Sequence, residues 1–157
     1  DKIQSKTFEL LVKILKKENN VRLTIKMRPG QKLDLSIFNQ FGNRVKIKTT
    51  GSGHSYLEKN NIVIAFNSTI LLEAFAAKKN VFAPFQNYKN QELFEFNKYA
   101  ICSNSAKFLE KKIINIIKNK KIKNLRDSKK IYKVLKLYTY NHDGKSGERL
   151  KNELEKH

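Results

Sequence analysis

Residues 62–84, IVIAFNSTILLEAFAAKKNVFAP, carry the clearest structural pattern in the chain. Residues 62–66 form a continuous apolar run of strand length, which is typical of a strand buried on both faces. The polar residues 67–69 follow at once, and residues 70–77 then continue with strong helix formers. Residues 81–83 make a second short strand. This order of strand, polar cap, helix and strand predicts parallel strands joined by a helical crossover.

The flanking sequence repeats this alternation. Upstream, we expect helices over residues 8–17, 34–41 and 54–60 and strands over residues 21–27 and 44–48. Downstream, after a loop over 86–97, we expect a strand over 99–102, helices over 103–117 and 128–138, a turn over 141–147 and a helix from 148. Such alternation predicts an α/β fold, a Rossmann-like parallel sheet with helices on both faces. Residues 1–157 contain no repeat or low-complexity linker and are expected to form a single domain.

The chain carries a large positive charge. Lys and Arg total 33 against 14 Asp and Glu, which gives a formal net charge of +19. This charge attracts anions, and nucleic acid, an anionic membrane surface, nucleotide diphosphates and polyanionic glycans are all compatible with it. The mixture of lysine with many Asn and Ile residues also arises from a compositionally biased genome without selection for binding. No Arg-Gly-Gly tract, metal finger or aromatic RNA-binding signature accompanies the charge, so a nucleic-acid partner is not favoured.

Cysteine content and hydropathy indicate the compartment. Cys102 is the only cysteine, which excludes an internal disulfide and a cysteine cage for zinc and fits a reducing cytoplasm. No run of about 18 apolar residues and no secretory signal is present. We therefore expect a cytoplasmic protein without a metal or cofactor. Peripheral contact with the inner face of an anionic membrane is compatible with this expectation.

Candidate binding residues follow the predicted strands, because ligands of open parallel sheets bind outside the carboxyl ends of the strands. Asn67, Ser68 and Thr69 stand between a strand and its helix, where unpaired amides suit a diphosphate. Capping of the helix by Asn67 or Ser68 is the alternative. Glu73 lies on an otherwise apolar helix and is placed to accept hydrogen bonds from ligand hydroxyls, although an exposed or ion-paired Glu would look the same.

Two further strand ends supply candidates. Lys26 and Arg28 are one residue apart, so on a strand both would reach one phosphate, unless they are merely solvated. Gly51 and Ser52 belong to a loop small enough for close backbone approach. His54 would contact phosphate, base or acceptor, or cap the short helix after it. Because no Asp or Glu lies beside it in the sequence, we assign no general base, and the catalytic residue is unknown.

Together, these segments resemble the donor-binding C-terminal domain of GT-B-fold glycosyltransferases. The resemblance lies in residues 26–29, 62–74, 81–84 and 141–149 and is strongest to enzymes of bacterial surface-carbohydrate and capsule biosynthesis, with the CDP-glycerol polymer transferases as neighbours. It implies that Ser68 and Thr69 hold the donor diphosphate, Glu73 the ribose, and Lys26 or Arg28 the phosphates. Arg28 stands where histidine is common in that family.

The resemblance implies the donor half of a metal-independent transferase. Such a domain holds a nucleotide-diphospho-sugar and offsets the charge of the leaving diphosphate, while a sugar or glycerophosphate passes to a surface polysaccharide or lipid-linked acceptor. In that family the acceptor site and any catalytic base come from an N-terminal domain, so this chain is expected to bind nucleotide with little or no transfer. The alternatives are a UDP-sugar epimerase-like domain, which needs acid and base carboxylates, and a basic nucleic-acid-binding module.

Overall fold

In the computed structural model, the described residues are 2–66, 68–86, 99–119 and 128–139, together with 145, 148, 151 and 152. In chain order they form α1 (Lys2–Lys17), β1 (Leu23–Lys26), the 3₁₀ segment η1 (Ser36–Arg44), β2 (Val45–Lys48), α2 (His54–Leu57), β3 (Ile62–Ile64), α3 (Ile70–Ala76), β4 (Asn80–Phe82), α4 (Ala106–Asn119) and α5 (Ser128–Thr139). The mixed helix and strand content confirms the α/β prediction at this level. The predicted loop beyond Gln86 and most of the turn over 141–147 lie outside the described residues.

The strands form two small parallel sheets. β1 pairs with β2, with Leu23 opposite Val45, and β3 pairs with β4, with Ile62 opposite Asn80. Of the strand predicted over residues 99–102, only a parallel bridge between Ile101 and Phe82 forms. In the part of the chain that the structure describes, no strand joins β1 to β3, so the single continuous sheet that we expected is not present there.

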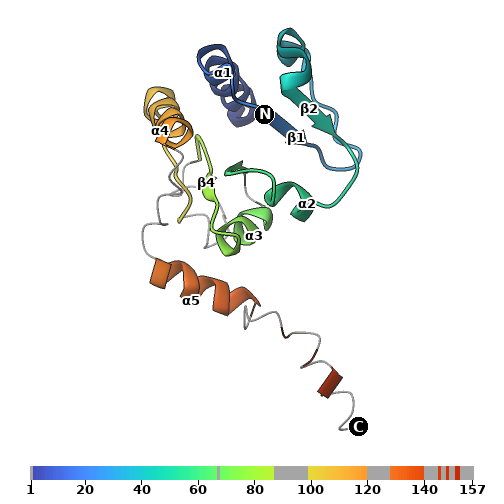
Figure 1. Cartoon of the computed structure of the whole chain (residues 1–157), viewed down its shortest axis with the longest axis vertical. Helices are drawn as coiled ribbons and strands as arrows, with labels where there is room; N and C mark the ends of the chain where they lie inside the picture. The colour runs from blue at the N-terminus through green and yellow to red at the C-terminus, as the bar shows by residue number, and fades with distance from the viewer. Residues whose placement is uncertain are drawn as a thin grey trace.

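Helices lie on both faces of the β3–β4 pair. Figure 1 shows α1 and α4 on one side and α2, α3 and α5 on the other. β4 explains how both layers attach, because successive side chains of a strand point to opposite faces. Phe82 is fully buried in the cluster with Leu10 and Leu109 from α1 and α4. Val81 packs instead in the cluster of α3 and α5, with Phe75.

The burial predicted for residues 62–66 is wrong. Ile62, Val63 and Ile64 of β3 are each half-buried, whereas all three residues of β4 are buried. The physical reason is position in the sheet. β4 lies between β3 and the bridge residue Ile101, but β3 has a described partner on one edge only.

Local signals start and bend η1. The Asp34 carboxylate accepts a hydrogen bond from the Ser36 amide at 3.0 Å, and hydrogen bonds from the Ser36 side chain and backbone hold the pKa of Asp34 below its ordinary value. Gly42 kinks the segment with a φ of 52°, a conformation that suits glycine. α4 begins as predicted, since the Ser105 hydroxyl oxygen accepts a hydrogen bond from the Phe108 amide at 3.2 Å.

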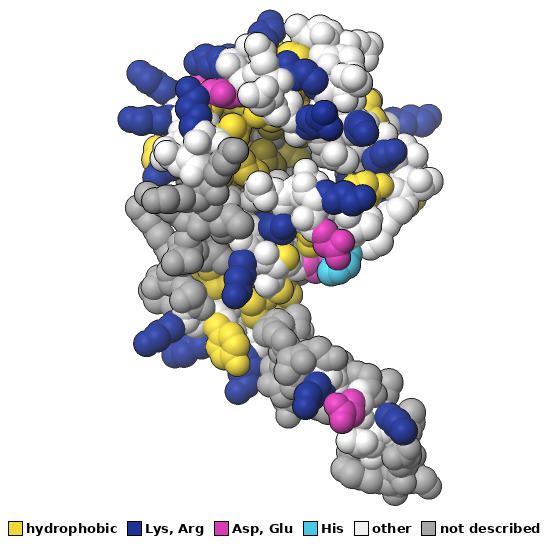
Figure 2. Space-filling view, viewed as in Figure 1, with side chains coloured by type: hydrophobic (Ala, Val, Ile, Leu, Met, Phe, Trp, Pro, Cys, Tyr) yellow, Lys and Arg dark blue, Asp and Glu magenta, His cyan; other side chains and the backbone are white. Residues whose placement is uncertain are grey.

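The positive charge is spread over the surface. On the face shown in Figure 2, Lys and Arg side chains are scattered over several elements rather than gathered in one patch. None of the described helices has the length and apolar character needed to cross a membrane.

Candidate functional site

The loops that follow β1, β2 and β3 meet at one end of the strands. After β2, a Cβ atom added at Gly53 would lie 2.9 Å from Cδ1 of Ile70, the first residue of α3. At the end of β1, the Lys26 ammonium donates a hydrogen bond to the carbonyl oxygen of Thr49 at 3.4 Å. These contacts join the carboxyl ends of three strands, which therefore run in the same direction. In a parallel α/β structure this is the edge where ligands bind.

His54 and Glu73, predicted from separate segments, face each other at this edge. His54 begins α2 and Glu73 lies in the first turn of α3. The His54 Nδ1 lies 3.9 Å from the Glu73 Oε2, and the two side chains are 71% and 48% exposed. This distance is too long for a hydrogen bond, so both groups remain open to a ligand. We did not expect a carboxylate beside His54, because no Asp or Glu lies next to it in the sequence.

The loop before His54 is held in shape by its own hydrogen bonds. Gly51 has a φ of +87°, and a Cβ atom there would lie 3.0 Å from the Tyr56 hydroxyl oxygen. That hydroxyl donates a hydrogen bond to the Thr50 carbonyl oxygen at 3.2 Å. The Ser52 hydroxyl oxygen accepts a hydrogen bond from the His54 amide at 3.2 Å. Gly51 and Ser52 thus build the loop, and His54 is its outward-facing polar side chain.

The junction between β3 and α3 is accessible to solvent, but the helix that follows it is short. Ser68 is half-buried and Thr69 is exposed. The Thr69 side chain makes no capping hydrogen bond, and the Ile70 amide is 3.5 Å from the Ser68 hydroxyl oxygen, a long contact. α3 has seven residues, so its dipole offers an anion little by itself. Asn67, the third candidate of this segment, lies outside the described residues.

Lys26 and Arg28 do not act as a pair on one strand face. β1 ends at Lys26, so the alternation expected to align the two cations does not extend to Arg28. The Lys26 ammonium donates a hydrogen bond to the Met27 carbonyl oxygen at 2.6 Å besides its bond to Thr49. Arg28 is exposed, and its amide donates a hydrogen bond to the Gln31 side chain at 3.2 Å. Lys26 therefore clamps two strand ends, and Arg28 is the cation of this segment available to a ligand.

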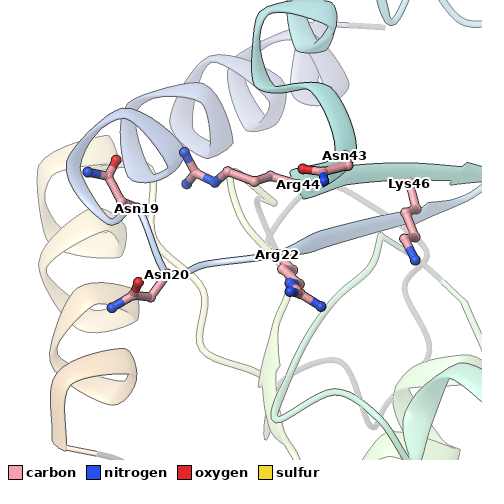
Figure 3. Close-up of a pocket in the computed structure, with 6 residues that line it drawn as sticks. All are labelled: Asn19, Asn20, Arg22, Asn43, Arg44 and Lys46. Atoms are coloured by element: carbon pink, nitrogen blue, oxygen red, sulfur yellow. The ribbon is translucent and has the colours of Figure 1, made fainter.

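A second polar hollow, which no sequence pattern predicted, lies at the opposite, amino ends of β1 and β2. It has a volume of about 320 Å³, within the range of small-ligand sites. Its lining, shown in Figure 3, is made of cations and amides: Asn19, Asn20, Arg22, Asn43, Arg44 and Lys46. In Figure 3, Arg44 extends toward the end of α1, whereas Arg22 and Lys46 point away from it.

Arg44 in this hollow has a structural role. Its guanidinium donates hydrogen bonds to the carbonyl oxygens of Leu15 at 2.8 Å, Glu18 at 2.7 Å and Val21 at 3.2 Å. These carbonyls belong to the end of α1 and to the loop after it, where helical partners run out. Arg44 thus caps α1, and this leaves Arg22 and Lys46 as the cations there without such a role. We prefer the carboxyl-end site, because three loops converge on it.

Comparisons with models of protein families, with curated proteins and with solved structures find no match to this chain. Among the described residues, no group of three or more His, Cys, Asp or Glu side chains is placed to hold a metal ion. Cys102 is half-buried, and its thiol donates a hydrogen bond to the Gln86 carbonyl oxygen at 3.1 Å. The geometry of the strand ends is therefore the basis for a functional proposal.

Proposed function

We propose that this chain is the donor-binding domain, Rossmann-like in topology, of a transferase that uses a nucleotide-diphospho-sugar. The observation that carries the proposal is the meeting of the loops after β1, β2 and β3, with His54 facing Glu73 at 3.9 Å. Two parallel strand pairs, of which the β3–β4 pair has helices on both sides, also support it. Such an edge provides exposed cations, a carboxylate and loop amides within one region, which is what a nucleotide diphosphate needs.

Each group has a role in this proposal. Arg28 and His54 contact the diphosphate oxygens, for which a guanidinium and an imidazole are suitable donors. Glu73 accepts hydrogen bonds from the ribose hydroxyls. Ser68 and Thr69 line the entrance with hydroxyls and amides, while Lys26 with Gly51 and Ser52 keeps the loops in place. Because α3 is short, the cationic side chains contribute more than the helix dipole.

The chemistry that follows is electrostatic. When the sugar or glycerophosphate leaves, negative charge builds on the diphosphate, and preorganised donors aimed at that charge lower the barrier. No covalent nucleophile or metal ion is required for this contribution. The acceptor and the catalytic base are assigned to another domain, so this chain by itself should bind nucleotide and transfer little. Transfer at full rate by this chain would contradict the division of labour proposed here.

A thermal-shift screen with UDP, CDP, ADP, GDP and CMP tests the proposal. Ligand at a hundred times its Kd stabilises a protein by about 2.7 kcal/mol. For a chain of this length that raises Tm by roughly 5–10 °C. We expect one diphosphate to give this shift and to saturate at one ligand per chain. If all five leave Tm unchanged at millimolar concentration, the nucleotide-binding proposal is wrong.

Matched variants place the ligand. Arg28→Gln should weaken nucleotide binding by about tenfold, which corresponds to the 1.4 kcal/mol expected for a charged hydrogen bond. Arg22→Gln removes the same charge from an exposed arginine before β1, at the other end of the strand, and should leave the Kd unchanged. Glu73→Gln should likewise weaken binding, with exposed Glu9→Gln on α1 as its control. Equal effects of Arg28→Gln and Arg22→Gln would indicate general charge attraction instead of a site.

A specific observation supports the nucleic-acid alternative. The outer face of α5 carries Lys129, Lys133 and Lys136 around Tyr132, which is 59% exposed, and these four residues line a hollow of about 560 Å³. Cations beside an exposed ring are suited to a single-stranded nucleic acid. Binding there should fall steeply with salt and be indifferent to nucleotide diphosphates. The epimerase alternative is tested by incubating labelled donor without acceptor, because only an epimerase changes the sugar under that condition.

A further inference from the structure

Among the strands of the described residues, β1 and β3 each have one edge that no other strand pairs with. The Met27 amide donates to the Lys48 carbonyl oxygen, and the Ala65 amide donates to the Phe82 carbonyl oxygen. Backbone groups of successive strand residues point to opposite edges, so those of Lys26 and Ile64 point away from β2 and β4. Among the described strands, none pairs with either of these edges. Unpaired strand edges are templates for a further strand.

α1 spans the space between these two edges. On one side, its Leu10 and Ile14 pack in the cluster that contains Ile62 and Ile64 of β3. On the other side, its Leu15 packs in the cluster that contains Leu23 and Ile25 of β1, together with partly buried Leu11. Two strands that flank a third lie about 10 Å apart. A helix with its side chains is about 10–12 Å wide, so α1 bridges a space that is one strand wide.

This space, which we call the strand slot, is open and apolar. In Figure 2, the surface between the two strand pairs is hollowed, and hydrophobic side chains lie at the bottom of the hollow. The residues on its β3 side are only half-buried, although Ile62 and Ile64 pack toward α1 and α4 and Val63 packs toward α3. Strands with helices on both faces are ordinarily buried. The half-burial of β3 is thus explained by a missing neighbour.

We propose that the strand slot takes an apolar β-strand that runs parallel to β1 and β3 and belongs to the polypeptide joined to the amino end of α1. The direction follows from α1. The connection from α1 to β1 is short, residues 18–22, and lies at the amino end of β1. The amino end of α1 therefore lies near the carboxyl ends of the strands, where a parallel strand in the slot would also end. A strand, α1 and β1 then form one crossover of the usual right-handed kind.

Filling the slot would merge the two sheets into one. The strands would then lie in the order β2, β1, the added strand, β3 and β4, with the bridge residue Ile101 next to β4. This is the order of a doubly wound sheet, and its switch point would lie beside the added strand. The carboxyl end of the added strand would lie between the loops that carry Arg28 and Ser68. This inference rests on the strand edges and holds whether or not the proposed ligand binds.

The test extends the whole chain before Asp1 by Lys-Thr-Val-Ile-Val-Val-Gly-Asn, a strand-forming segment with a short link. A matched control replaces its Ile and last Val by Pro, which removes two amide donors and disfavours a strand. Amide hydrogen exchange followed by NMR reports on Thr24 and Lys26 in β1 and on Ile62 and Ile64 in β3. The Leu109 amide in α4 serves as an internal reference.

We expect at least tenfold slower exchange of these four amides in the extended chain than in the proline control, with a higher urea midpoint. The proline control should match the unextended chain. Equal exchange in the extended chain and the proline control overturns the proposal. If sedimentation shows that the unextended chain is a dimer with these amides already protected, the occupant is a second copy and the proposed source of the strand is wrong. If the extended chain aggregates, a second extension with Thr in place of the first Val is used. Slower exchange than in the proline control again supports the proposal, and equal exchange overturns it.

Discussion

Arg44 offers the most direct test of the structure. Its guanidinium reaches three carbonyl oxygens, those of Leu15, Glu18 and Val21, at 2.7–3.2 Å. It also lies over the Phe41 ring, 5.7 Å from the ring centroid. We consider the substitution Arg44→Met, which keeps an unbranched stem and removes all three hydrogen bonds.

The expected loss follows from the number of bonds. A hydrogen bond contributes about 1 kcal/mol net, and more when the donor is charged. Three bonds to Arg44 therefore predict a loss of about 3 kcal/mol in the free energy of unfolding. For a chain of this length, each kcal/mol corresponds to about 2–4 °C in Tm, so the decrease should be roughly 6–12 °C. Arg44→Lys keeps the charge but not the planar fork of donors, and its loss should be intermediate.

Urea unfolding followed by circular dichroism measures this loss, with Arg22→Met as the control. Arg22 lines the same hollow but is exposed, and its replacement should change the free energy of unfolding by less than about 0.5 kcal/mol. If Arg44→Met and Arg22→Met unfold at the same urea concentration, water satisfies the end of α1 and our account of Arg44 is refuted.

Two further predictions concern local conformation. Gly51→Ala should lower the free energy of unfolding by about 1–3 kcal/mol, because the φ of Gly51 is +87° and the new methyl group would lie 3.0 Å from the Tyr56 hydroxyl oxygen. The control Gly30→Ala has a φ of +74° and no atom within 4 Å of the new methyl group, so it should lose only the part due to backbone strain. Equal losses in thermal unfolding would show that the Tyr56 contact is unimportant. NMR titration should give Asp34 a pKa below 3.8, and Ser36→Ala should raise that pKa, because the Ser36 hydroxyl and amide favour the carboxylate. The stabilisation from Asp34 is then present above its ordinary pKa and is lost as the pH falls through the lowered one; an unchanged pKa in Ser36→Ala would contradict this.

Local sequence patterns were enough to predict the type and order of most elements. Apolar spacing in residues 8–17 and alternation in residues 21–27 and 44–48 are local patterns that predicted α1, β1 and β2. The strand ends agree within two residues, whereas α1 begins at Lys2, six residues before its predicted start. The strand predicted over residues 99–102 is reduced to a bridge at Ile101. A strand forms only where a partner strand satisfies its backbone, and such partners are not encoded in the local pattern.

Contacts between residues distant in the chain depend on the three-dimensional packing. It placed Glu73 beside His54, turned Lys26 to the Thr49 carbonyl oxygen and used Arg44 to cap α1. Each of these contacts joins residues that are distant in the chain, so no periodicity could predict it. The half-burial of β3 has the same origin, because an apolar run specifies what a strand can bury, whereas its neighbours decide how much of it is covered.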